Sequence, residues 1–380
     1  LCFLCYRWIM RVSQKLSKRR IARAAAAAAK QNAPTQSTAP PPKPRKKRVP
    51  KLAFDVNNAN DFVKQMLHEG RYALLLRPEV IGNLTAAQRA ETLSLLHEEM
   101  TFTPEGDVKA HDEESCHPNI RRPAAGLAHA ENVFVDRYPI TNEQYKYFLD
   151  AGGYESDEYW DEGVFESVTS FVDQTGELGP RYWQHGEFPA GHDDHPVVGI
   201  NWYEANACAR WLGKRLPEGA EWVKTASTPV LGPDGAIHQR KYPWGNSFGE
   251  GRANTWSAGV GRTVPVTEFE TGASASGAYQ FVGNVWEWTR DELMIHHTKP
   301  EAGRQYRCKS IRGGAFDTYF ECQATCHFES GDDPYARKAN IGFRCVVSAS
   351  ELARDVYENV QRTEIDPSQI SSDTLVAGVS

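Results

Sequence analysis

Glu287 lies in the segment FVGNVWEW, residues 281–288, where polar and large apolar side chains are mixed. It stands between two tryptophans, and Asn284 precedes it by three positions. Burial of an ionised carboxylate without a partner costs several kcal/mol. Glu287 must therefore be paired with the backbone, with a basic side chain such as Arg344, or with a bound cation. The residues alone leave these alternatives open.

A pair of thiols is the second feature that could do chemistry. Cys322 and Cys326 lie in GGAFDTYFECQATC, residues 313–326. Positions four apart can face the same way on a helical turn, which would let the two thiols act as a pair. The alternative is that both are small buried residues, as cysteines outside disulfides often are. The sequence has no P-loop, GxSxG, GxGxxG or HExxH pattern that would indicate another catalytic site.

Composition limits the classes of function open to the chain. Its 380 residues, 40% of them hydrophobic and 24% charged, suffice for one large domain with appendages or for two smaller domains. Residues 1–51 hold 14 Lys or Arg and no acidic residue, so the remainder has 29 basic and 49 acidic residues. Such an acidic body argues against nucleic acid or an anionic membrane as its main partner. Eight cysteines are too dilute for a disulfide scaffold.

Residues 1–52 are predicted to form a basic, Ala- and Pro-rich disordered arm, which either contacts an anionic surface or acts as a solvated tether. The arm starts with LCFLCYRWIM, which has about half the apolar length of a membrane-spanning helix. We interpret these ten residues as the end of a truncated membrane anchor or as mis-assigned upstream sequence. Basic residues directly after an anchor would leave the body cytoplasmic, and this is the location we expect.

Residues 53–100 are predicted to form a helical preface, because apolar side chains return there at helical spacing. The string NLTAAQRAETLSLLHEEM supplies a helix start at Asn83 or Thr85, followed by strong helix formers. From 101 to 350 the sequence changes to short segments rich in Gly, Pro, Trp and Tyr. Residues 351–380 are predicted to be a C-terminal tail.

Two helices are predicted inside the segment that follows the preface. TNEQYKYFLDAGG has a capping residue at Thr141 or Asn142 and stops at Gly152. NWYEANACARWLGKRLP starts at Asn201 and stops at Gly213. The rest should be loops and short strands packed around these helices, which is an α+β arrangement.

Six short motifs occur in order along residues 100–348: VFVDRYPITNEQYKYFL, HPVVGINWYEANACARWLGKRLPEGAEW, YPWGN, GAYQFVGNVWEW, RGGAF and NIGFRCV. In this order the motifs resemble the sulfatase-modifying-factor family, whose best-known member is the formylglycine-generating enzyme. The resemblance implies a single domain distantly similar to C-type lectins, with little regular secondary structure. Members of the family include copper-dependent oxidases that convert a cysteine in a sulfatase's Cys-x-Pro-x-Arg segment to formylglycine, iron-dependent sulfur oxidases, and proteins without known catalysis. Fold alone therefore does not fix the function.

The resemblance also suggests a structural calcium at the FVGNVWEW turn, with ligands at Gln280, Gly283, Val285 and Glu287. Calcium prefers carboxylate, amide and backbone carbonyl oxygens, and such a cation would stabilise a buried Glu287. Asn254 is a candidate ligand for the family's second calcium, although this loop is shortened and lacks the family's aspartate.

The copper site of the family's oxidases has two cysteines five residues apart, just after a GGS turn. Here Ala315 replaces the serine, and Thr318 stands where the first cysteine is expected. Gln323 falls at the second position if the alignment has no gap. Cys322 and Cys326 are therefore the candidate catalytic residues only if the loop shifts its register.

Three further assignments depend on the resemblance. The first tryptophan of the family's WEW segment lines the substrate groove, which makes Trp286 a candidate substrate-binding residue. Arg344 is a second candidate, because a guanidinium forms bidentate pairs. A structural role is the alternative for both. Cys208 and Cys345 occupy the positions of a disulfide in the family's secreted members, whereas in a cytosolic protein they would be reduced neighbours in the core.

Two functions are consistent with these features. The first is a formylglycine-generating-enzyme-like oxidase or maturation factor that acts on an extended protein segment, with calcium as a structural ion, copper as the redox metal and a sulfatase as a candidate substrate. The second is a non-catalytic module on the same fold that binds a peptide or a glycan. The altered cysteine spacing favours the second function.

Overall fold

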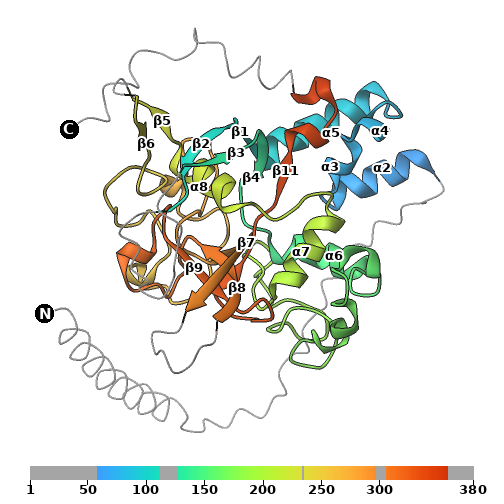
Figure 1. Ribbon diagram of the computed structural model, residues 1–380. Coiled ribbons are helices and arrows are strands. Elements are labelled where there is room, and N and C mark those ends of the chain that lie inside the picture. The colour runs from blue at the N-terminus through green and yellow to red at the C-terminus, as the bar shows by residue number, and fades with distance from the viewer. Residues whose placement is uncertain (1–57, 112–126, 233–234, 297–304, 358–380) are drawn as a thin grey trace, which may run out of the picture. The chain divides into compact units, whose positions relative to one another are not determined.

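The amphipathic pattern before residue 100 is realised as helices, shown in blue and cyan in Figure 1. They are α2 (Ala59–His68), α3 (Tyr72–Leu75), α4 (Pro78–Ile81) and α5 (Ala86–Glu99). α5 begins with a capping box: the Thr85 hydroxyl accepts a hydrogen bond from the Gln88 N–H, and the Gln88 side chain accepts one from the Thr85 N–H. Of the two helix starts expected here, Thr85 is the one observed.

The structure, a computed structural model, describes residues 58–111, 127–232, 235–296 and 305–357. These residues belong to one compact unit, which begins at Ala53. The predicted basic arm, residues 1–52, lies outside the described residues. No helix within the described ranges is long and apolar enough to cross a membrane.

The helical preface shares an apolar core with a three-stranded antiparallel sheet. The sheet has the order β1-β4-β11 and consists of β1 (Met100–Thr103), β4 (Val133–Asp136) and β11 (Val346–Ser348). Phe102 and Phe134 of this sheet lie in one hydrophobic cluster with Leu76 and Leu96 of the preface. The preface therefore completes the core of the domain.

Buried polar contacts join the same two parts. The Lys214 ammonium donates to the Tyr72 hydroxyl at 2.8 Å and pairs with the Asp136 carboxylate at 2.7 Å. Arg77 donates to the carbonyl of Gly213 at 2.9 Å. Because Tyr72 and Arg77 belong to the preface, these bonds fix its position on the domain.

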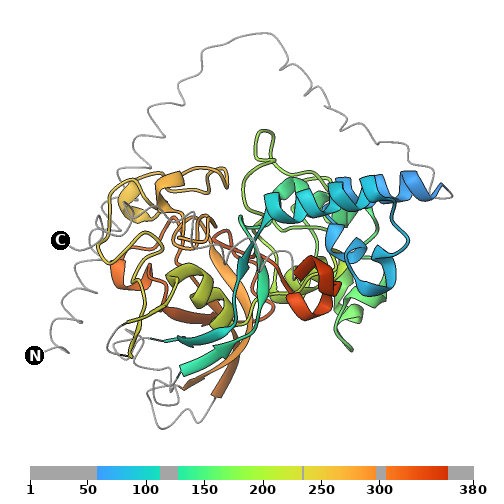
Figure 2. The same cartoon turned by 90° about the horizontal axis from the view of Figure 1, so that it is seen from above.

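The first residues of the predicted C-terminal tail also pack on the preface. Leu352 and Val356 are buried in the cluster that contains Leu76. The N–H of Ala353 donates to the Leu76 carbonyl at 2.9 Å. Figure 2 shows this red segment beside the blue and cyan helices. Residues 352–357 are therefore part of the folded domain rather than of a tail.

A four-stranded sheet carries the FVGNVWEW motif. Its order is β10-β7-β8-β9, with β10 parallel to β7 and the other pairs antiparallel. The strands are β7 (Trp286–His296), β8 (Gln305–Arg312), β9 (Glu329–Asp332) and β10 (Ile341–Gly342). Two short antiparallel pairs complete the strands: β2 (Gly106–Lys109) with β3 (Leu127–Ala130), and β5 (Val230–Leu231) with β6 (Ile237–His238). The motif therefore enters the sheet at Trp286, opposite Ile341.

The two helices predicted from the middle of the sequence are confirmed as α6 (Asn142–Asp150) and α7 (Trp202–Trp211). Thr141 and Asn201 cap them, each in a capping box with the residue three positions on. Gly213 follows Leu212, the C-cap of α7, and its φ of +74° favours glycine. A Cβ there would lie 2.4 Å from the Leu74 side chain, so this glycine also permits close contact with the preface.

A third helix in this part, α8 (Gly219–Ser227), was not predicted. Its N-cap is Glu218, which forms a capping box with Glu221 and is not one of the usual capping residue types. Trp222 and Val223 of α8 are fully buried, and α8 contributes to a cluster with Val135 of β4 and Phe281. α8 thus brings the Trp222 indole to the start of β7.

Candidate functional site

Glu287 is fully buried, and its partner is Arg344. Arg344 Nε donates to Glu287 Oε2 at 2.7 Å, and Arg344 Nη2 donates to Oε1 at 2.7 Å. The Trp222 indole N–H donates to Oε2 at 2.7 Å. Bidentate arginine–carboxylate pairs are among the strongest hydrogen-bonded pairs in proteins. Of the alternatives left open by the sequence, the basic side chain is the one that faces Glu287 in the described structure.

Neither residue predicted to bind substrate is available at the surface. Arg344 is 0% exposed and also donates to the backbone carbonyls of Asp136 and Tyr279, at 3.0 and 2.7 Å. Its substrate-binding role does not fit this position, because every donor group points into the protein. Trp286 is 8% exposed and packs in the main hydrophobic core, 6.0 Å from the ring of Phe328. The positions of Arg344 and Trp286 fit the structural role that the sequence analysis gave as the alternative to substrate binding.

An amide network holds the turn that precedes β7. Asn284 has a φ of +64°, and its amide nitrogen donates to the Val264 carbonyl at 3.0 Å and to the Gln280 side-chain oxygen at 2.6 Å. The Asn284 side-chain oxygen accepts from the Val264 N–H at 3.0 Å and from the Asn254 amide at 3.1 Å. Asparagine tolerates a left-handed backbone better than most residues do, and here its side chain also binds both neighbouring segments.

The calcium predicted at this turn faces competition from protein groups. A carboxylate has about four acceptor positions, and Arg344 and Trp222 use three of those on Glu287. A cation would have to share the carboxylate with the guanidinium. The Gln280 side-chain oxygen is likewise bonded within the protein. The described arrangement of Gln280, Gly283, Val285 and Glu287 therefore favours the ion pair over the calcium predicted there, and a chelator experiment distinguishes the two.

Asn254 differs from the other predicted calcium ligands. Its side-chain oxygen is buried and has no hydrogen-bond partner in the described structure, while its amide nitrogen donates to the Arg262 carbonyl at 2.9 Å. An unpaired oxygen keeps Asn254 as a candidate ligand. Across the described residues, no group of three or more His, Cys, Asp or Glu side chains is arranged to hold a metal ion.

The loop after β8 is closed by Thr318, the residue predicted to stand where the family's oxidases have their first copper-binding cysteine. The Thr318 hydroxyl accepts a hydrogen bond from the Ala315 N–H at 2.8 Å, and the Thr318 N–H donates to the Ala315 carbonyl at 2.9 Å. Gly313 has a φ of +95°, and a Cβ on it would lie 2.4 Å from the Phe281 carbonyl oxygen. The turn therefore packs directly against the FVGNVWEW segment, with a hydroxyl where copper chemistry would need a thiolate.

The two thiols predicted to be catalytic lie in different environments. The Cys322 thiol is exposed, whereas Cys326 is 0% exposed and lies in a core cluster with Phe281. Burial raises the pKa of the Cys326 thiol, which disfavours the thiolate that a soft metal binds. The arrangement does not place Cys322 and Cys326 on a common accessible face, so it does not support their role as a catalytic pair.

Cys208 and Cys345 are fully buried thiols that form no disulfide. Burial raises the pKa of both thiols well above its usual range. The Cys345 N–H donates to the Asp136 carboxylate at 2.8 Å. Both residues therefore act as small, unreactive core side chains.

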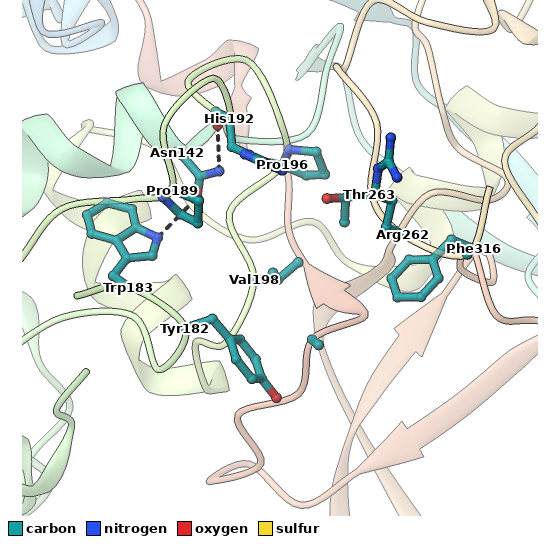
Figure 3. A pocket seen from close by; sticks show the side chains of 12 residues that line it. Asn142, Tyr182, Trp183, Pro189, His192, Pro196, Val198, Arg262, Thr263 and Phe316 are labelled. Carbon is teal, nitrogen blue, oxygen red and sulfur yellow. Dashed lines mark hydrogen bonds between the residues drawn. The ribbon is translucent and has the colours of Figure 1, made fainter. Parts of the chain in front are cut away.

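A pocket of about 230 Å³ opens beside the loop after β8 (Figure 3). Residues from five separate segments line it, including Tyr182, His192, Arg262, Thr263, Phe316 and Ala339. Phe316 belongs to the Thr318 turn, and Ala339 lies just before β10. The pocket thus adjoins the turn that Thr318 closes.

Exposed aromatic side chains continue from this loop. Trp256, Tyr319 and Phe320 are 46%, 66% and 53% exposed. The ring centroids of Trp256 and Tyr319 are 6.0 Å apart, and those of Tyr319 and Phe320 are 5.2 Å apart. The Trp256 N–H donates to the Thr318 carbonyl at 3.2 Å, which ties the two segments together. We call these three side chains the aromatic surface.

Comparison with known protein families assigns the fold. The family model described as "Sulfatase-modifying factor enzyme 1-like domain" matches residues 86–349. The chain belongs to this family. The expected α+β, formylglycine-generating-enzyme-like fold is thereby confirmed, whereas the distant similarity to C-type lectins stays a prediction.

Relatives of this sulfatase-modifying-factor protein carry different names. It is 29% identical to the formylglycine-generating enzyme of Mus musculus, over 60% of this chain and 70% of that protein. It is 31% identical to hercynine oxygenase of Mycobacterium tuberculosis, over 61% and 56% respectively. It is 30% identical to the serine/threonine-protein kinase Pkn1 of Chlamydia trachomatis, over 72% and 42%. The chain therefore spans less than two thirds of several of the relatives that it matches, and family membership does not fix its activity.

Solved structures with a similar chain path include PvdO from Pseudomonas aeruginosa and CarF. PvdO has a TM-score of 0.42 and 22% identity, over 65% of this chain and 93% of that chain. CarF has a TM-score of 0.43 and 18% identity, over 66% and 98%.

The sequence did not predict the pocket or the aromatic surface. Tyr182, Arg262 and Phe316 are far apart in the chain and carry no motif of a binding site. The run YF at 319–320, two large aromatics in a polar loop, was the only local signal of an exposed binding surface.

Proposed function

We propose that this member of the sulfatase-modifying-factor family binds an extended protein segment and does not oxidise it. The observation that carries the proposal is the Thr318 turn. A hydroxyl bonded to the Ala315 N–H stands at the position predicted for the family's first copper-binding cysteine, and a threonine hydroxyl is a poor ligand for the soft cuprous ion. Burial of Cys326 removes the nearest replacement for a second thiolate.

Support for binding comes from the surface beside this turn. Soluble proteins rarely leave large aromatic side chains clustered in solvent, and such clusters commonly mark interaction sites. The aromatic surface next to the pocket offers ring faces to an extended chain, and aromatic side chains dominate the energetics of many protein interfaces. We take a protein segment rather than a glycan as the ligand because the family's formylglycine-generating enzyme acts on a protein segment.

Catalysis and binding can be tested separately. The full chain is loaded with cuprous ion and incubated in air with a Cys-x-Pro-x-Arg peptide, and aldehyde formation is followed by mass spectrometry. We expect no aldehyde, and no difference between the wild type and the Cys322→Ser/Cys326→Ser double variant. Aldehyde that forms with the wild type and is lost in the double variant would establish the oxidase function instead.

Binding is tested by selecting random peptides displayed on phage against the immobilised full chain. We expect enriched sequences whose binding falls about tenfold in Tyr319→Ser, since a central interface aromatic is worth about 1–2 kcal/mol or more. The matched control is Phe62→Ser, which removes an exposed aromatic, 44% exposed, from α2. Equal losses in both variants, or no enrichment with the wild type, would contradict the proposal.

A further inference from the structure

We infer that the pocket lined by Arg262, Tyr182 and Thr263 recognises a carboxylate, so that the segment bound by this protein carries an acidic anchor residue. The inference rests on the proposed peptide-binding function and specifies its ligand. It also differs from the sulfatase segment Cys-x-Pro-x-Arg, whose charged residue has the opposite sign.

Arg262 supplies an unused positive charge. Its side chain is exposed and forms no ion pair or hydrogen bond in the described part of the chain, and only its backbone carbonyl is engaged, by Asn254. None of the residues that line the pocket is acidic. A guanidinium presents several N–H donors in a planar fork that matches a carboxylate. Acidic residues outnumber basic ones in the body of the chain. An arginine without an acidic partner beside a pocket therefore favours a negatively charged ligand at that position.

Acidic side chains near the pocket do not neutralise Arg262. Asp193 and Asp194 are exposed residues of the adjoining loop and do not line the pocket. Asp317 follows Phe316; its carboxylate accepts from the Asn340 amide at 3.1 Å and forms no ion pair with Arg262 within the described residues. The positive charge at the pocket therefore stays available to a ligand.

Two hydroxyl groups, those of Tyr182 and Thr263, belong to residues that also line the pocket. Tyr182 has no hydrogen-bond partner for its hydroxyl in the described structure, and its ring is held against Gly199, where a Cβ would lie 2.5 Å from the ring. Thr263 Oγ1 lies 3.1 Å from His195 Nδ1. Burial lowers the pKa of His195, so this imidazole is neutral at neutral pH and adds no charge of its own.

The Asn142 side chain, which also lines the pocket, is already hydrogen-bonded on both of its polar atoms. The Asn142 amide nitrogen donates to the His192 carbonyl at 2.7 Å, and the Asn142 oxygen accepts from the Trp183 indole N–H at 3.2 Å (Figure 3). Asn142 therefore shapes the wall and does not select the ligand. Recognition is left to Arg262, the two hydroxyls and the His192 imidazole, with Phe316 as an apolar wall.

The size of the pocket limits its occupant. Its volume of about 230 Å³ is below the roughly 300 Å³ at which pockets for drug-sized ligands begin. One acidic side chain or a chain-terminal carboxylate fits this scale, and the aromatic surface lies within the same loop system to hold the neighbouring residues. The pocket then sets the register of the bound segment.

The inference is tested by the phage selection on the full chain, repeated with Arg262→Gln, Arg262→Lys and the control Arg307→Gln. Arg307 is an exposed arginine of β8, with a side chain that is 75% exposed. We expect the wild type and Arg307→Gln to enrich Asp or Glu at one fixed position, and Arg262→Gln to lose this preference. For a selected peptide, Arg262→Gln should weaken binding about 10- to 100-fold, the range for a hydrogen bond to a charged group, and Arg262→Lys should retain part of the affinity.

Two further arms separate the possible outcomes. Peptides displayed with a free carboxyl terminus and peptides fused at both ends distinguish a terminal carboxylate from an acidic side chain. Calorimetry with phenylpropionate, an apolar acid, and with phenylpropionamide tests the pocket without a peptide.

Peptide binding without an acidic preference overturns the inference and leaves the proposed function standing. Binding of phenylpropionate through Arg262 without any peptide enrichment overturns the proposed function and retains the carboxylate site. Failure of both arms overturns both.

Discussion

Arg344 and Glu287 illustrate how charged residues can serve folding rather than catalysis. Both side chains are fully buried, and the pair is completed by the Trp222 indole and by backbone carbonyls. A buried pair of this kind contributes little net stability compared with an apolar replacement of both residues, but removal of one partner leaves an uncompensated charge. The pair therefore makes each residue necessary to the other.

Removal of the arginine alone should reveal this dependence. We expect Arg344→Met to lower the free energy of unfolding by about 3–5 kcal/mol, because Glu287 then lacks its counter-charge. The control is Arg307→Met, which removes an exposed arginine 3.8 Å from Glu292 and should cost less than about 1 kcal/mol. Urea unfolding followed by tryptophan fluorescence measures both values. Similar midpoints for the two variants would show that Arg344 is not essential to the core.

The same pair bears on calcium. A cation that binds only the folded state raises the melting temperature by mass action. Since Arg344 already neutralises Glu287, we expect excess chelator to leave the melting temperature of the wild type unchanged. A fall on adding chelator that is abolished in Glu287→Ala would instead establish the predicted calcium site, and a fall abolished only in Asn254→Ala would move the site to that residue's unpaired oxygen.

At the scale of elements, glycines at helix ends set how closely segments approach. Gly213 follows the C-cap of α7, has a φ of +74° and faces the Leu74 side chain of the preface. Gly163 has a similar φ of +78°, but a Cβ on it would meet nothing within 4 Å. Replacement of either glycine by a residue with a Cβ therefore has a similar conformational cost. The two positions differ in the space available to that Cβ.

Alanine substitutions at these positions should separate the two contributions. We expect Gly163→Ala to cost about 1–2 kcal/mol for the left-handed backbone alone. Gly213→Ala should cost a further 1–3 kcal/mol or so, because the new methyl group overpacks the contact with Leu74. Leu74→Ala should lower the free energy of unfolding by less in the Gly213→Ala variant than it does in the wild type. Additive losses in this cycle, measured by urea unfolding, would show that α7 and the preface do not press on each other at Gly213.

The sequence predicted elements whose signals are local. Thr85, Thr141 and Asn201 are standard capping residues, so three helix starts could be recognised without tertiary information. α8 was missed because its cap is Glu218. The choice of Arg344 over calcium could not be predicted, since it depends on a residue 57 positions from Glu287. The pocket was unpredictable for the same reason, as its walls come from segments that meet only in the fold.

At the scale of the whole chain, the boundaries of the folded body matter most. The body includes Leu352 and Val356, which are buried against the helical preface. Residues 1–51, by contrast, have a composition that cannot build a core, with 14 basic residues, an alanine run and a proline-rich spacer. The two ends of the chain should therefore respond differently to truncation.

Two truncations test these boundaries. Deletion of residues 1–51 should leave the free energy of unfolding unchanged within about 0.5 kcal/mol, because such a segment buries almost nothing. Deletion of residues 352–380 should lower it by about 3 kcal/mol or more, since buried apolar side chains are lost from the preface cluster. Differential scanning calorimetry of both forms gives the comparison. Destabilisation by the first deletion would indicate that the basic arm docks on the acidic body, and a neutral second deletion would restore the boundary at residue 351.

Asn284 carries a consequence for how this lineage can change. Its left-handed backbone and its four side-chain hydrogen bonds exclude almost every replacement: glycine keeps the backbone but loses the bonds, and aspartate lacks the two donors. Selection for folding alone is enough to preserve this residue, together with Glu287 and Arg344. The FVGNVWEW signature can therefore persist over long divergence, whatever chemistry the neighbouring loop performs. Ancestral reconstruction of this family should accordingly show that the turn held by Asn284 arose once, whereas the residues at the position of Thr318 changed repeatedly.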